Sequence, residues 1–198
     1  MGDSDASSSA PSGDRNGQIS NLPQLHRYIT GHDEAGKAIV LHQNDFAWQP
    51  YDGNQLAFSV PYTTSQFPPD LNGDADFAAH KQVLASDSLG LVNPRGTVFR
   101  CVDFAPGYAC GMHRTQSLDY GIVLEGQVDM VLDSGEVHPL KRGDVAIQRA
   151  TQHQWVNKSK TDWARMMFVL QDCKMLVVAG KEMGEDLGET SGLPPSGN

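Results

Sequence analysis

Two histidines and one aspartate are the side chains of this sequence whose types and spacing could do chemistry together. His113 and Thr115 stand in the stretch MHRTQSLDYG, Asp119 follows four residues after the threonine, and His153 stands in ATQHQWVN. Two imidazoles and one carboxylate can bind a divalent metal ion and leave coordination positions open; iron, zinc, manganese and nickel all fit such donors. Without a metal the same groups form a proton-transfer site, because histidine titrates near neutral pH and an aspartate can orient an imidazole. The residues themselves leave both kinds of site open.

Arginines and aromatic residues near these groups are candidates for binding a substrate. Guanidinium groups match carboxylate and enolate oxygens, so Arg114, Arg149 and Arg165 are expected to contact the substrate, with Arg114 also steadying an oxyanion during catalysis. An ion pair at the surface or at the rim of the fold is the competing interpretation for each arginine. Thr115, Trp155 and Tyr62 are expected to line the substrate pocket, although filling the core is an equally available role for the two aromatic residues.

Short β-strands must position these residues. From residue 96 onward, apolar and β-branched runs alternate with turn sequences such as Asp-Ser-Gly and Lys-Arg-Gly, which is typical of an antiparallel sandwich or barrel. The gaps are too short for the helical crossovers of a parallel sheet. The predicted strands are Thr97–Phe104, Tyr120–Leu124, Gln127–Leu132, Val137–Leu140, Asp144–Gln148, His153–Val156 and Trp163–Leu170.

Strand periodicity predicts which side chains share a face. Alternation places His113 and Thr115 together, and it places Asp119 and Gly121 together on the next strand. We expect both sets to point into the barrel, where the missing side chain of Gly121 would leave space for a ligand.

The parts of the chain outside the predicted barrel are a leader, an extension and a tail, which differ in composition. Residues 1–20 and 181–198 are rich in Ser, Gly, Asp and Pro and are predicted to be a disordered leader and tail. Residues 21–95 are predicted to form an extension that packs on the barrel at 96–180. Within it we expect a β-hairpin over Arg27–His42, then a strand over Leu56–Thr64. A short helix over Asp76–Leu84 completes the extension.

Composition excludes several classes of function. The 198 residues carry a formal net charge of −9, which disfavours nucleic-acid binding, since that depends on basic residues. No apolar run reaches the roughly 20 residues of a membrane span. Three cysteines and no recognisable secretory signal favour reduced thiols in a cytoplasmic protein. No glycine-rich dinucleotide fingerprint is present, so no nucleotide cofactor is indicated.

The spacing of the two histidine stretches resembles the two motifs of the cupin superfamily. The matching positions are Gly107, His113, Thr115, Asp119 and Gly126 in the first motif and Gly143, His153 and Asn157 in the second. The family pattern has a second histidine at position 115 and a glutamate at 119, and its second motif is one residue longer. The resemblance implies a double-stranded β-helix, or jelly roll, over roughly residues 96–171. It also implies a metal ion bound by His113, Asp119 and His153, with Thr115 as a poor fourth ligand.

A narrower resemblance covers most of the chain. The stretches HRTQSLDYG, QRATQHQWVN, RYITGHDEAGKAIV and YTTSQFP are similar to small fungal cupin-domain proteins of secondary-metabolite gene clusters, often described as oxidoreductases. This similarity implies an all-β cupin fold with an N-terminal hairpin extension and little helix. Because cupins commonly dimerise, it also implies a homodimer, to which the hairpin could contribute an edge strand.

The leading functional prediction is an enzyme that acts on a small, oxygenated, polyketide-derived substrate in the barrel. The chemistry would be metal-assisted redox or acid–base catalysis by an isomerase, dehydratase, cyclase or decarboxylase. The resemblance weakly favours an oxidoreductase over an isomerase or lyase. The alternative is a barrel that binds a small molecule without catalysis, since one fold hosts many functions.

Overall fold

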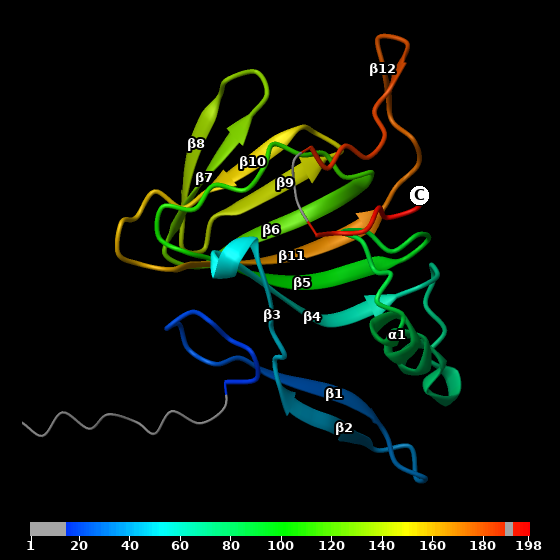
Figure 1. The fold of residues 1–198 in the computed structure, drawn as a ribbon. Coiled ribbons are helices and arrows are strands. Elements are labelled where there is room, and N and C mark those ends of the chain that lie inside the picture. The colour runs from blue at the N-terminus through cyan, green and yellow to red at the C-terminus, as the bar shows by residue number, and fades with distance from the viewer. Residues whose placement is uncertain (1–14, 189–191) are drawn as a thin grey trace, which may run out of the picture.

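A barrel of two facing antiparallel sheets forms the body of the molecule in the computed structural model, which describes residues 15–188 and 192–198 (Figure 1). One sheet has the strand order β3-β4-β5-β11-β6-β9 and the other has the order β10-β7-β8. The strands are β3 Gln49–Tyr51, β4 Leu56–Thr64, β5 Thr97–Phe104, β6 Ser117–Glu125, β7 Gln127–Leu132, β8 Val137–Lys141, β9 Val145–Arg149, β10 His153–Val156 and β11 Ala164–Asp172. Strands distant in sequence lie side by side, which confirms the predicted jelly roll with little helix.

Alternation of side chains explains why these segments form the barrel walls. In β5, Val98, Val102 and Phe104 are buried in the main core, whereas Cys101 belongs to a second cluster on the opposite face of the sheet. The predicted bounds of β4, β5, β7 and β10 match the observed ones. Strand β6 begins three residues earlier than predicted, at Ser117, because the polar side chains at its start are buried and bonded to one another inside the barrel.

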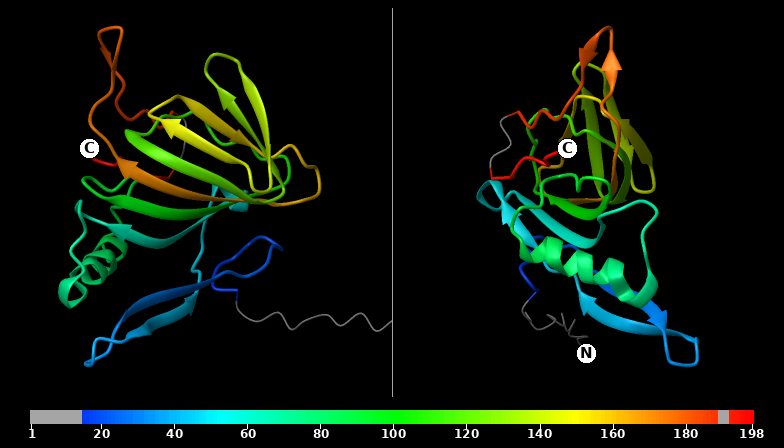
Figure 2. Two further views of the ribbon diagram at one scale, coloured as in Figure 1. Left: turned by 180° about the vertical axis from the view of Figure 1, so that it is seen from behind. Right: turned by 90° about the vertical axis from the view of Figure 1, so that its right-hand side faces the viewer.

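The N-terminal region adds a hairpin and a helix beside the larger sheet. Strands β1 (His26–His32) and β2 (Ala38–Asp45) pair in antiparallel fashion, as predicted. Helix α1 (Ala75–Ala85) follows the short 3₁₀ turn Asn72–Asp74, and Figures 1 and 2 show both the hairpin and the helix on the β4 side, away from β7 and β8. Strands β3 and β4 lie in the extension predicted for 21–95 but pair into the barrel sheet, so the two regions share one sheet.

An N-terminal segment covers the outward face of the larger sheet. Phe46 and Trp48 pack there on Ala57 and Cys101. This second cluster gives the sheet two buried faces, one inside the barrel and one beneath the N-terminal segment.

Both ends of the described chain make specific contacts. Gln18 and Ser20 are buried, although the leader was expected to extend to residue 20; residues 1–14 lie outside the described part. Ser196 is also buried, and its hydroxyl accepts a hydrogen bond of 3.0 Å from the Val92 backbone amide. Leu193, which also lies in the stretch predicted as a tail, packs against the core.

A small hairpin of β12 (Val177–Val178) and β13 (Lys181–Glu182) projects beyond the barrel (Figure 1). None of the helices in the described ranges has the length and apolar character that crossing a membrane requires.

Candidate active site

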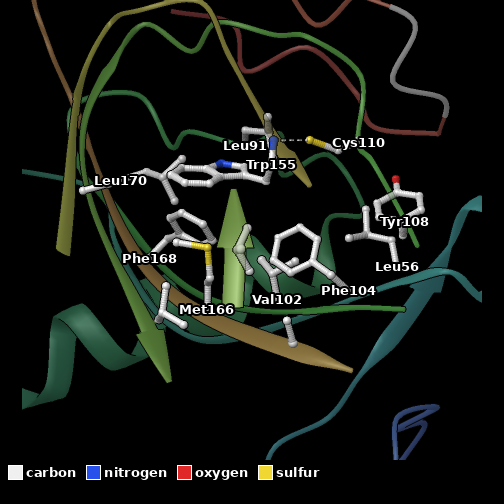
Figure 3. Packing of buried hydrophobic residues seen from close by; sticks show 14 of the residues in the cluster. Leu56, Leu91, Val102, Phe104, Tyr108, Cys110, Trp155, Met166, Phe168 and Leu170 are labelled. Carbon is white, nitrogen blue, oxygen red and sulfur yellow. Dashed lines mark hydrogen bonds between the residues drawn. The ribbon is translucent and has the colours of Figure 1, made fainter. Parts of the chain in front are cut away.

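A cavity of about 70 Å³ lies inside the barrel and is lined by both sheets. Its apolar wall includes Phe104, Trp155 and Phe168, and Figure 3 shows the Trp155 indole lying above the rings of Phe168 and Phe104. The polar side chains on the wall are Asp52, Arg100, His113, Thr115, Asp119 and His153. The structure therefore brings the two histidines and the aspartate to one cavity, as predicted from strand alternation.

The two histidines form a closely matched pair. His113 and His153 exchange backbone hydrogen bonds of 2.9 and 2.8 Å, which places their ring centroids 4.4 Å apart. Each ring directs Nδ1 at the carbonyl oxygen two residues earlier, Gly111 or Thr151, at 2.9 Å. Because a carbonyl only accepts, Nδ1 must carry the hydrogen in both rings. In the neutral state Nε2 of each imidazole is then an unprotonated base.

Burial keeps both imidazoles neutral. It lowers the pKa of His113, and burial together with the neighbouring charge of His113 lowers the pKa of His153 to about 3. A positive charge is costly in a buried site, so neither ring carries an extra proton near neutral pH. Each Nε2 is therefore free of a proton in the cavity near neutral pH.

The carboxyl group of Asp119 belongs to a closed ring of three hydrogen-bonding groups. Ser117 Oγ lies 2.5 Å from Oδ1 of Asp119, Thr115 Oγ1 lies 3.2 Å from Oδ2, and the two hydroxyls are 2.8 Å apart. Two hydroxyl hydrogens can satisfy only two of these contacts, and a proton on the carboxyl would satisfy the third. Burial raises the pKa of Asp119 to about 6, against the opposing effect of the hydroxyl hydrogen bonds.

These donors do not fit the metal centre that the resemblance implies. Both oxygens of Asp119 are engaged by hydroxyl groups, and Thr115 directs its oxygen at the carboxyl rather than acting as a ligand. Within 15–188 and 192–198, no group of three or more His, Cys, Asp or Glu side chains is arranged to hold a metal ion. His113, Asp119 and His153 thus share a cavity without forming a three-ligand set.

Two of the predicted substrate-binding residues lie in the cavity. Thr115 and Trp155 are both on its wall, and the backbone amide of Trp155 donates to Cys110 Sγ at 3.2 Å, the dashed contact in Figure 3. The edge of the His153 ring also meets the indole, with centroids 5.3 Å apart. Trp155 therefore packs against His153 of the histidine pair and also lines the cavity.

The three predicted arginines are placed elsewhere. Arg114 donates from Nε to the carbonyl oxygen of Gly184 at 2.7 Å, and Arg149 is exposed on β9. Arg165 lies on the outward face of β11, where it is paired with Asp103. None of the three lines the cavity. The physical reason for Arg149 is strand parity, since its neighbour Gln148 takes the inward position.

Tyr62 is also outside the cavity. Its hydroxyl donates to Asp76 Oδ2 at 2.5 Å, and its ring stacks on His80 with centroids 4.6 Å apart. Both partners lie on α1. Tyr62 therefore attaches the helix to β4 and has no contact with the proposed substrate.

Gly121 does not open space for a ligand, contrary to the prediction. It faces inward, as expected, but a Cβ atom added there would lie 2.9 Å from Cε1 of Phe168. The missing side chain makes room for that ring, and the ring in turn lines the cavity.

Sequence reasoning missed Arg100, the arginine that does line the cavity. The signal was present in the strand TVFRCVDF, where alternation gives Arg100 the same face as Val98, Val102 and Phe104. A charged side chain on an otherwise apolar strand face is expensive to bury, which makes it a candidate functional residue.

Comparison with known proteins supports the observed architecture. A family model for the cupin domain matches residues 100–170. The chain is 40% identical to phomopsin biosynthesis cluster protein D of Diaporthe leptostromiformis, over 93% of this chain and 98% of the relative. It is 39% identical to oryzines biosynthesis cluster protein J of Aspergillus oryzae, over 85% of this chain and 94% of that relative.

A third relative carries a name that describes an activity. It is the cupin-domain-containing oxidoreductase fogC of Aspergillus ruber, 40% identical over 86% of this chain and 83% of the relative. With coverage this extensive on both sides, the barrel, its histidine pair and these relatives lead to one conclusion: the chain belongs to the cupin-domain proteins of fungal biosynthesis clusters.

Proposed function

We propose that this protein is a biosynthetic enzyme that removes and returns a proton on a small oxygenated substrate inside the barrel. The reaction class is isomerisation, dehydration, cyclisation or decarboxylation. The observation that carries the proposal is the matched pair His113 and His153, whose Nδ1 atoms are both bonded to carbonyl oxygens. That arrangement supports two neutral imidazoles with basic Nε2 atoms in one cavity.

The chemistry follows from the position of each group. One imidazole Nε2 takes a proton from a carbon next to a substrate carbonyl, and electron density moves to the carbonyl oxygen. The resulting imidazolium returns the proton at a second position, so the enzyme ends each cycle unchanged. Asp119, when its carboxyl group is ionised, stabilises by its charge the imidazolium that forms in the same cavity. The ring with Ser117 and Thr115 holds that carboxyl in place.

The names of some relatives include the word oxidoreductase. Proton removal is compatible with that label, since oxidation of a carbon–hydrogen or oxygen–hydrogen bond also requires a base. The electron acceptor would have to be supplied with the substrate. A polyketide origin of the substrate stays a prediction.

Deuterium exchange on a neutral ketone tests the proposed proton transfer. In heavy water, the enzyme should accelerate exchange of the acidic C–H groups of phenylacetone, followed by proton NMR. His113→Gln and His153→Gln should each slow this exchange at least about 100-fold, the usual contribution of a general base. His138→Gln is the matched control, because His138 lies on β8 outside the cavity and its side chain is 52% exposed.

No acceleration by the unmodified protein would contradict the proposal and favour the non-catalytic binding barrel. Independently of turnover, nitrogen-15 NMR of the histidine rings at neutral pH should show the Nδ1–H form for both residues. An Nε2–H form would remove the structural basis of the mechanism.

We also propose the homodimer that the resemblance implies. Strand β9 is an edge of the six-stranded sheet, and its apolar side chains Val145 and Ile147 are exposed, next to Tyr120 of β6. Exposed apolar edges promote association. Light scattering at micromolar concentration should give twice the mass of one chain, and the mass of a single chain would contradict this.

A further inference from the structure

Arg100 is a buried cation that the fold leaves largely unpaired. Its side chain is only 3% exposed and lines the same cavity as the histidine pair. Nη2 donates to the carbonyl oxygen of Gly90 at 2.7 Å, and the guanidinium lies over the ring of Phe58, 4.8 Å from its centroid. Nε and Nη1 have no hydrogen-bond partner among the described residues. The three N–H groups of these two nitrogens therefore have no partner.

Leaving these groups unpaired is costly. A buried donor without a partner has lost its hydrogen bond to water, and a buried charge has also lost its hydration. Burial lowers the pKa of Arg100 to about 10, so the group still carries its charge at neutral pH. An uncharged side chain could make the single hydrogen bond to Gly90, so this bond does not explain a guanidinium at this position. The position is therefore suited to bind an anion from outside the chain.

The acidic residues of the cavity are not hydrogen-bonded to Arg100, although the charge of Asp119 in the same cavity favours the charged form of the guanidinium. Asp119 uses both carboxyl oxygens on Ser117 and Thr115. Asp52 accepts a hydrogen bond from the hydroxyl of Tyr108. No ion pair or hydrogen bond joins either carboxyl group to Arg100 in the described parts of the chain.

We propose that Arg100 binds the carboxylate of the substrate through its unpaired N–H groups. This deepens the proposed function and rests on it for the claim that the bound molecule is a substrate. Planar guanidinium and carboxylate groups match in geometry and charge. The rest of the ligand would be apolar or aromatic, because the adjoining wall consists of Val102, Phe104, Trp155 and Phe168 (Figure 3).

The volume limits the size of the acid. A cavity of about 70 Å³ holds roughly five waters, which is enough for a small aromatic acid but not for a large ligand. Held at Arg100, such an acid would extend toward His113 and His153 on the wall of the same cavity. Arg100 thereby selects organic acids and positions them for the imidazole bases.

Binding of benzoate and benzamide tests this assignment without turnover. The two molecules have nearly the same shape, and only benzoate is charged. Calorimetric titration of the full chain should show benzoate binding at least tenfold tighter than benzamide. Arg100→Met should reduce benzoate affinity at least tenfold and leave benzamide affinity unchanged. Arg100→Lys, which keeps the charge but loses the planar group, should fall between the two.

Arg142→Met is the matched control, because Arg142 is 75% exposed and lies outside the cavity. It should bind both molecules as the unmodified protein does. Equal affinity for benzoate and benzamide in the unmodified protein would overturn the assignment, and so would full benzoate affinity in Arg100→Met. If Arg100→Met fails to fold, the benzoate-to-benzamide ratio of the unmodified protein and of Arg100→Lys still decides the question.

The exchange and binding experiments distinguish failure of the proposed proton transfer from failure of the carboxylate assignment. If phenylacetone shows no exchange but benzoate binding depends on Arg100, the barrel binds organic acids without acting as a base. If exchange occurs and depends on the histidines but benzoate is not preferred, the catalytic proposal stands and the carboxylate assignment is overturned.

Discussion

Two buried arginines lie on opposite faces of one sheet, and their surroundings differ. Arg165 on β11 is 1% exposed and faces outward, whereas Arg100 on β5 is 3% exposed and faces the cavity. Arg165 donates from Nε and Nη2 to the two carboxyl oxygens of Asp103 at 2.5 and 2.7 Å, and from Nη1 to the carbonyl oxygen of Pro23 at 2.6 Å. Arg100 has one protein hydrogen bond.

This difference in pairing indicates that Arg165 is a structural residue and Arg100 a functional one, although both are buried arginines. On the outward face, the carboxylate of Asp103 also accepts from Ser20 Oγ at 2.5 Å, so the ion pair attaches the N-terminal segment to the sheet. Trp48 stacks on the guanidinium of Arg165, 4.7 Å from its ring centroid. A carboxylate therefore neutralises the charge of Arg165, whereas no carboxylate is bonded to Arg100 among the described residues.

The largest expected effect on stability comes from breaking the ion pair of Arg165 and Asp103 on the outward face of the sheet. Asp103→Ala should destabilise the fold by about 3–5 kcal/mol, because it leaves the buried guanidinium of Arg165 without its carboxylate. Urea unfolding followed by tryptophan fluorescence measures the change. Glu136→Ala is the control, since Glu136 is 63% exposed and lies 3.2 Å from exposed His138 in a surface pair worth about 1 kcal/mol or less. Equal stability of the two variants would contradict the structural role of Asp103.

A substitution on the inward face should change the activity more than it changes the stability of the fold. His153→Gln is expected to reduce ketone exchange about 100-fold or more, while the free energy of unfolding changes by less than about 1.5 kcal/mol. Glutamine can still donate to the carbonyl of Thr151 but provides no base at the position of Nε2. Rate and urea midpoint are measured on the same preparation. A large loss of stability with retained exchange would reverse the contrast between the two faces.

Acidification should weaken the fold through its buried histidines. Burial lowers the pKa of His153 to about 3 and that of His80 to about 4. The unfolded chain then binds protons below pH about 6.5 that the folded chain excludes, so stability present above that pH is lost toward pH 4. Asp119 opposes this, because its raised pKa of about 6 gives stability that is present at low pH and lost as the pH rises through 6.

Since two histidines outweigh one carboxyl group, Tm should fall by about 5 °C between pH 7 and pH 5. His153→Gln should show a smaller fall in a thermal scan. An unchanged Tm over this range would show that the two imidazoles are not excluded from protonation in the folded state.

The smallest effect is expected from neutralising the unpaired arginine. Arg100→Met should leave the free energy of unfolding within about 1 kcal/mol of the unmodified value or raise it, because it removes a buried charge that lacks a partner. The same substitution at Arg165 should be severely destabilising. Urea unfolding of the two Met variants compares the faces directly. Similar losses in both would mean that Arg100 is structural.

Much of the barrel could be predicted because its information is local. The strand bounds of β4, β5, β7 and β10 follow from apolar runs between turn residues, and the shared face of His113 and Thr115 follows from alternation. The spacing of the histidine motifs was sufficient to identify the cupin family, which the comparisons confirm. These inferences do not depend on which residues of other strands each strand contacts.

The errors at the site arose where a neighbour distant in sequence decides the outcome. Gly121 was expected to leave a space, and Phe168 from β11 fills it. Arg165 was expected at the substrate, and Asp103 from β5 binds it on the other face. Asp119 was considered as a metal ligand, but the hydroxyls of Ser117 and Thr115 engage both of its oxygens.

The sequence by itself determined the fold, the family and the three residues His113, Asp119 and His153 that meet in the cavity. These depend on periodicity and spacing, which are properties of the chain before it folds. Only the tertiary structure decided which arginine faces the cavity and which is neutralised. The physical reason is that the charge and hydrogen-bonding capacity of a buried group depend on partners brought from other strands, and pairing is absent from any single stretch of sequence.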